Sequence, residues 1–142
     1  MKRFYIFILF QAFFSLMAGY MVASMSWIGK VGIRFFYSEY AIFRSWWKTG
    51  LLFLLIQCAL WIVQWLVRKK ARLTTSYIVS CSLLALGALG LFATYNDFQN
   101  TLSHRLLKEK FHLGFYLFWI CWMANCFYFL LWKKKVVEKE GV

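Results

Sequence analysis

Apolar residues form four long runs along the chain, and the segments between the runs hold most of the charged residues. The runs cover residues 4–27, 50–67, 73–95 and 111–132. About 20 predominantly apolar residues are enough for a helix to cross the hydrocarbon core of a bilayer, and a spanning helix satisfies its own backbone hydrogen bonds. The pattern therefore predicts an all-α integral membrane protein. It forms one membrane domain over residues 1–142, with four transmembrane helices in a bundle.

The first run also has features of a cleaved secretory signal. It follows the sequence MKR and contains VAS near its end, which is typical of a cleavage site. Its length and its aromatic content favour a retained first span instead.

A second periodicity lies between the first two runs, over residues 30–48. Polar and basic residues, beginning with Lys30 and Arg34, recur there every three or four positions, and aromatic residues recur on another face. This pattern predicts an amphipathic helix that lies in the membrane interface, between the first and second spans. We interpret it as an anchor rather than as a lid or docking surface, because Trp and Tyr concentrate at interfaces whatever the function.

The composition agrees with a membrane protein. Hydrophobic residues make up 63% of the sequence and charged residues only 15%, which is too little polar surface for a soluble domain. The formal net charge is +12. The bases gather at the ends of the apolar runs rather than in one continuous stripe, so nucleic-acid binding is not predicted.

The distribution of the bases predicts the orientation of the spans. Ten of the 17 Lys and Arg residues lie in short segments on one side, namely the amino terminus, the RKKAR turn and the tail over residues 133–142. The other seven are spread over two longer loops. Because Lys and Arg are enriched in cytoplasmic loops, both termini are predicted to be cytoplasmic, in a bacterial inner membrane or an equivalent membrane.

No acidic residue, basic residue or histidine lies near the middle of any apolar run. Ionisable residues inside a membrane mark proton relays and coupled transport, so the sequence argues against a proton-coupled transporter. All four cysteines lie within the runs, and we interpret them as buried apolar residues rather than as disulfides. No metal site is predicted.

Small residues recur at helical spacing in two of the runs. In lipid, such stripes allow helix backbones to approach closely. We expect them to pack the bundle, and an interface with a partner or a second copy is the alternative. The stripe residues are Ser15, Gly19 and Ala23 in the first run, and Ser76, Ser80, Gly87, Gly90 and Thr94 in the third.

Four amide side chains also lie within the runs: Gln11, Gln57, Gln64 and Asn125. Amides in a bilayer usually form hydrogen bonds across helices, and we expect that role here. The alternative is that they line a pocket for a quinone, a lipid or a solute. An amide alone supplies neither a nucleophile nor a proton relay.

The polar connection over residues 96–112 holds both histidines, His104 and His112. Their spacing of eight residues is too long for one metal ion to be bound from a single helix. Three interpretations remain: a solvated connection, a contact to lipid headgroups or an acidic partner, and a redox or hydrolytic site that uses a histidine. The bases suited to a headgroup or partner contact are Lys30, Arg34, Arg44, Arg105, Lys108 and Lys110.

Together these features favour helix packing over chemistry. We expect a small non-catalytic membrane subunit or accessory protein that packs against a larger membrane complex or against copies of itself, without a cofactor. The alternative is a quinone-, lipid- or haem-binding protein with its site at the outer interface, near His104 and His112. A channel or carrier is the least favoured class, because the span interiors are uncharged.

Overall fold

The computed structural model describes residues 2–24, 31, 34–35, 38–100 and 109–132. Helix α1 (Lys2–Ala23) is followed by the 3-10 helix η1 (Ser38–Arg44) and by α3 (Trp46–Lys70), α4 (Leu73–Asn100) and α6 (Glu109–Leu131). Each of these four α-helices is long and apolar enough to cross a membrane. The prediction of an all-helical chain with four candidate spans is therefore confirmed.

The helices extend beyond the apolar runs at several ends. Helix α3 begins at Trp46 and ends at Lys70, so it includes basic residues after the second run. Helix α4 continues to Asn100, whose side chain donates a 2.7 Å hydrogen bond to the Asn96 side chain one turn earlier. A helix needs no apolar residue to continue, and the chain has no proline to stop one.

A single amphipathic helix over residues 30–48 is not confirmed. In the described part of that segment, Val31, Arg34 and Phe35 are helical, Ser38–Arg44 form η1, and Trp46–Lys48 are the first residues of α3. Ser45 separates the two helices with an extended backbone (φ −104°, ψ 115°). The Oγ1 atom of Thr49 lies 3.0 Å from the carbonyl oxygen of Ser45 and closes this junction. The segment therefore bends, where the periodicity predicts one straight element.

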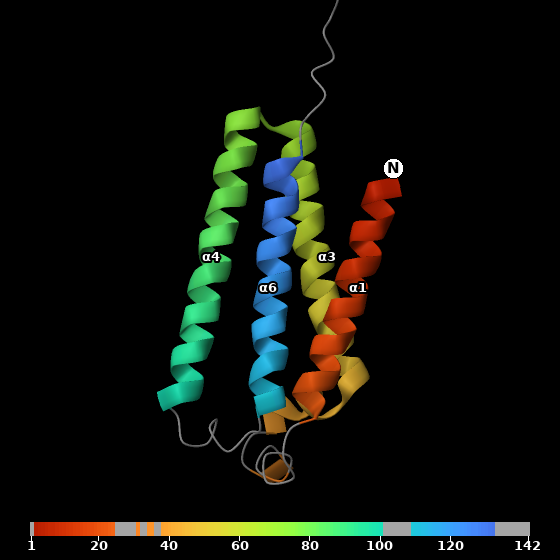
Figure 1. The fold of residues 1–142 in the computed structure, drawn as a ribbon, viewed down its shortest axis with the longest axis vertical. Helices are drawn as coiled ribbons and strands as arrows, with labels where there is room; N and C mark the ends of the chain where they lie inside the picture. Colours follow the sequence, from red (N-terminus) through yellow and green to blue (C-terminus); the bar gives the residue numbers. More distant parts are fainter. Residues whose placement is uncertain (1, 25–30, 32–33, 36–37, 101–108, 133–142) are drawn as a thin grey trace, which may run out of the picture.

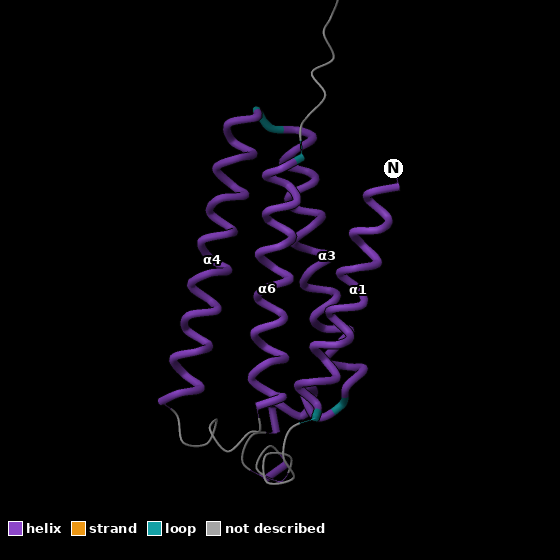
Figure 2. The backbone as a smooth tube through the Cα atoms, in the orientation of Figure 1, coloured by secondary structure: helices purple, strands orange, loops and turns teal. Residues whose placement is uncertain are grey.

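Helix α6 lies at the centre of the helix arrangement. It contacts α1, α3 and α4, whereas α1 and α4 make no contact with each other within the described residues. Figure 1 shows α6 between α4 and α1, with α3 behind it. Figure 2 shows the tight turn that joins α3 to α4, at the end of the molecule where the N-terminus lies. Helix α4 is therefore attached to the other spans through α6 and α3 alone.

The buried residues of each helix recur mostly every three or four positions, as expected for one face of a helix. This face carries small residues, amides and aromatic rings, while many large apolar side chains are exposed on the outside. Helices in lipid are held together by close approach and hydrogen bonds, because apolar burial gives no driving force there. In α3 the buried series is Thr49, Gly50, Phe53, Gln57, Leu60, Gln64 and Arg68.

Candidate functional site

Glutamine side chains from two helices donate hydrogen bonds to the backbone of α6. Gln11 of α1 donates from Nε2 to the carbonyl oxygen of Cys121 at 3.0 Å. Gln57 of α3 donates from Nε2 to the carbonyl oxygen of Phe118, one turn earlier, at 3.2 Å. Both glutamines are buried. These bonds hold α1 and α3 against the same part of α6.

Two further amides connect the helices. Asn125 of α6 is fully buried and donates from Nδ2 to the carbonyl oxygen of Gln57 at 3.2 Å. Gln64 of α3 donates from Nε2 to Sγ of Cys126 at 3.7 Å, and its Oε1 accepts a 3.2 Å hydrogen bond from Oγ of Ser80 in α4. Gln64 therefore links α3, α4 and α6.

These amides differ in how much of their hydrogen-bonding capacity they use. The oxygens of the Gln11, Gln57 and Asn125 side chains are buried and accept no hydrogen bond from the described residues, and the Ser15 hydroxyl is likewise unpaired. A buried polar atom without a partner costs free energy, so we expect Gln57 to stabilise the bundle less than Gln64. An amide can bind a polar group, but it is not an acid, a base or a nucleophile at neutral pH.

The small residues of α1 lie against other helices of the same chain. Ser15, Gly19 and Ala23 are all buried. A Cβ atom at Gly19 would lie 2.5 Å from the Cα atom of Gly50 in α3. Helices α1 and α3 therefore meet backbone to backbone, and only glycine fits at the crossing.

In α4 the small residues accommodate tryptophan rings of α6. A Cβ atom at Gly87 would lie 2.5 Å from Cδ1 of Trp122, and a Cβ atom at Gly90 would overlap the ring of Trp119. The Trp119 indole donates a 2.9 Å hydrogen bond to Oγ1 of Thr94, and the Trp122 indole donates one of the same length to a backbone carbonyl of α4. The packing around these α4 residues is therefore within the chain.

His112 lies near the start of α6, in a cluster of aromatic rings. Its half-buried imidazole stacks on Phe98 of α4, with 4.4 Å between ring centroids and 21° between planes. The Phe98 ring also lies 5.7 Å from Phe111 and 5.9 Å from Phe115. Within the described residues, no three His, Cys, Asp or Glu side chains gather in a way that would hold a metal ion.

The predicted headgroup and cofactor residues are only partly described. Those outside the described residues are Lys30, His104, Arg105 and Lys108. Among the described ones, His112 is half-buried. The other three are exposed at the surface, namely Arg34, Arg44 and Lys110. The charges of these three exposed bases are accessible to an anionic group.

Arg68 is a polar residue whose role was not predicted from the sequence. It follows the second apolar run, yet only 7% of its surface is exposed. Its Nη1 lies 3.4 Å from Oγ of Ser76, its Nη2 donates to the carbonyl oxygen of Trp132, and its guanidinium lies 4.9 Å from the ring centroid of Tyr77. Arg68 thus joins the ends of α3, α4 and α6. The signal in the sequence is its position four residues after Gln64, on the same helix face.

Helix α4 also has small residues on its outer face, and no role for them was predicted from the sequence. Cys81, Ala85 and Ala88 are exposed and follow one another at spacings of four and three residues. We call these three residues the outer stripe of α4. The interpretation of all four cysteines as buried is therefore wrong for Cys81 and for Cys58, which is exposed on α3. Leu89, one turn beyond Ala85, is 66% exposed. Of the most apolar 18 residues of α4, 11% are buried, against 33% in α1 and in α6.

The chain matches no protein-family model, no curated protein and no solved structure. The function is therefore inferred from the structure alone, that is, from the amides, the glycine contacts and the exposed helix faces.

Proposed function

We propose that this chain is a small, non-catalytic membrane subunit or accessory protein, which acts by packing its helices against a larger membrane complex or against copies of itself. The observation that carries the proposal is the outer stripe of α4, a line of exposed small residues on the least buried of the four spans. Small residues let helix backbones approach closely, and this packing drives helix association in lipid. A helix that faces only lipid has no need of such a stripe.

The other polar and small groups of the described spans support the same function. The four amides form hydrogen bonds between helices of the chain. Gly19 and Gly90 are covered by neighbouring helices of the same chain. These groups hold the subunit together, and the outer stripe remains as a small-residue surface for a partner.

The mass of the protein particle in mild detergent tests this function. We expect a particle whose protein mass exceeds the 17.0 kDa of one chain, because the outer stripe contacts another helix. Ala85→Trp places a large ring in the stripe and should reduce the mass towards that of one chain. The matched control is Leu55→Trp, at a 66% exposed position of α3, and it should leave the mass unchanged. A wild-type protein that runs as one chain without a co-purifying partner would contradict the proposal.

For the orientation, we propose that both termini and the tail over residues 133–142 are cytoplasmic, in a bacterial inner membrane or an equivalent membrane. The support is the excess of bases around the α3–α4 turn and at the two termini. A green fluorescent protein fused to the C-terminus should fluoresce, and alkaline phosphatase fused after Asn100 should be active. The reverse pair of signals would overturn this orientation.

The alternative function is the binding of a quinone, a lipid or a haem near His104 and His112. The observation that favours it is the aromatic cluster around His112, since stacked rings hold flat apolar ligands well. An absorption spectrum and a solvent extract of the purified protein test this alternative. A Soret band that disappears in His112→Ala would replace the packing function with a haem-binding one.

A further inference from the structure

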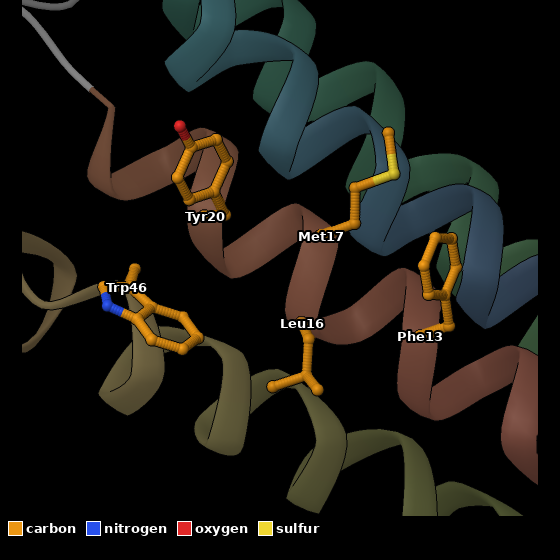
Figure 3. Close-up of a pocket in the computed structure, with 5 residues that line it drawn as sticks. All are labelled: Phe13, Leu16, Met17, Tyr20 and Trp46. Carbon is orange, nitrogen blue, oxygen red and sulfur yellow. The ribbon is translucent and has the colours of Figure 1, made fainter.

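A shallow hollow of about 470 Å³ lies on the outside of the bundle, where α1 meets the start of α3. Phe13, Leu16, Met17 and Tyr20 of α1 line it together with Trp46 of α3. All five side chains are exposed, so the hollow opens outward, towards the lipid that would surround these spans. Figure 3 shows Phe13, Leu16, Met17 and Tyr20 extending from α1, with Trp46 on the neighbouring α3.

The hollow is lined almost entirely by apolar atoms, and two polar groups lie near one end, which we call the polar end. Figure 3 shows the Tyr20 hydroxyl and the Trp46 indole nitrogen at one end, and the Phe13 ring at the other. Tyr20 is close to the last residue of α1, and Trp46 is the first residue of α3, so the polar end lies where both helices end. Phe13 lies seven residues deeper, which is about 10 Å along a helix. The hollow is thus apolar along its length, with two polar groups near the ends of the two helices.

A base lies two residues before Trp46 in the chain, at the end of η1. Helix η1 packs against both α1 and α3, and it ends at this base, Arg44. The Arg44 side chain is exposed. A guanidinium binds phosphate oxygens through paired N–H groups, while indole and phenol groups prefer the headgroup level of a bilayer.

We propose that this hollow binds one acyl chain of an anionic phospholipid, whose phosphate is held by Arg44 beside Tyr20 and Trp46. The acyl chain lies along the α1 face formed by Phe13 and Met17. The shape suits this occupant better than a helix, because a helix is about 10–12 Å wide and needs a longer groove. The site is separate from the outer stripe of α4, so it goes beyond the packing function.

Native mass spectrometry of the full chain in detergent tests the proposal, with phosphatidylglycerol and phosphatidylcholine of identical acyl chains as probes. We expect the wild type to retain one phosphatidylglycerol in preference to phosphatidylcholine. Arg44→Gln should weaken phosphatidylglycerol binding about ten-fold, because a charge-assisted hydrogen bond to the phosphate is lost, and leave phosphatidylcholine binding unchanged. Met17→Trp fills the hollow and should weaken the binding of both lipids.

Two matched controls separate this site from general attraction to lipid. Lys48 is a base two residues after Trp46, about 200° around the helix from it, and its ammonium lies 5.5 Å from the Trp47 ring centroid. Lys48→Gln and Ile62→Trp, at an exposed position of α3, should bind both lipids like the wild type. Equal retention of the two lipids by the wild type would overturn the proposal. So would equal losses in Arg44→Gln and Lys48→Gln, or a retained ligand that is not a phospholipid.

Discussion

At the scale of single residues, the interior of this bundle is held by side chains that reach the backbone or a side chain of a neighbouring helix. Gln64 uses both ends of its amide, one towards Cys126 and one towards Ser80. Gln57 uses only its nitrogen, towards Phe118, and its oxygen is buried without a hydrogen-bond partner among the described residues. The two glutamines share a helix face and are equally buried, so they form a natural comparison.

Replacing each glutamine by leucine should give different losses of stability. Interhelical hydrogen bonds in membranes contribute about 0.6 kcal/mol on average and up to about 1.7 kcal/mol. We expect Gln64→Leu to lower the free energy of unfolding by about 1–2 kcal/mol, because two bonds are lost. Gln57→Leu should cost about 0.5 kcal/mol or less, because the unpaired oxygen is removed together with the bond. Unfolding in detergent, followed by circular dichroism, measures the loss of unfolding free energy in both variants. A larger loss in Gln57→Leu than in Gln64→Leu would contradict the difference expected from their hydrogen bonds.

The sequence indicates the intramembrane amides but not every polar contact. Gln57 and Gln64 stand out because amides are rare in apolar runs. Arg68 does not stand out, because it is followed by Lys69 and Lys70 and has the same charge as they do. Its burial depends on where α4 and the end of α6 lie, since Ser76 and Trp132 supply its partners. The position of Arg68 four residues after Gln64 indicates the shared helix face, whereas the identity of its partners depends on the tertiary structure.

At the scale of helices, two kinds of contact hold the bundle. Helices α1 and α3 meet backbone to backbone at Gly19 and Gly50. Helices α4 and α6 meet through tryptophan rings that fill the space above Gly87 and Gly90. A side chain can shift to relieve a new methyl group, whereas a helix backbone cannot do so without moving the whole helix. The α1–α3 contact should therefore tolerate less added volume.

Adding one methyl group at each contact tests this difference. We expect Gly19→Ala to destabilise the protein by about 3 kcal/mol, the upper end of the usual cost of overpacking. Gly90→Ala should cost about 1 kcal/mol, because the Trp119 ring can move and alanine favours the helix. Thermal unfolding of the two variants in the same detergent gives the comparison. Equal melting temperatures would contradict the backbone contact between α1 and α3.

The elements themselves were predictable where they were long and apolar. The four candidate spans follow from runs of about 20 apolar residues. Helices α3, α4 and α6 extend past their runs because polar residues can continue a helix, whereas α1 ends at Ala23, inside the first run. The segment over residues 30–48 is different. Its periodicity favours one helix, but the extended backbone at Ser45 ends η1 and starts α3. A bend at one serine leaves little trace in a pattern of polar and aromatic positions.

At the scale of the whole molecule, the four spans form an arrangement with a central helix and one peripheral helix. Helix α6 contacts the three other spans, and α4 is attached along one side only. The contacts of Gly87 and Gly90 account for the inner side of α4, and the outer stripe remains uncovered within the described chain. The sequence predicts that small residues mediate packing. It does not indicate which of them face the chain's own helices, because that depends on the rotation of α4 about its axis.

Photocrosslinking in native membranes tests most directly the claim that α4 packs against another membrane helix. p-Benzoylphenylalanine replaces Leu89 beside the outer stripe in one variant and Leu55 of α3 in another, and each wild-type residue is 66% exposed. We expect one discrete crosslinked protein from position 89, either a second copy or a distinct partner, and only lipid adducts from position 55. Lipid adducts alone from both positions, or the same protein from both, would contradict this claim.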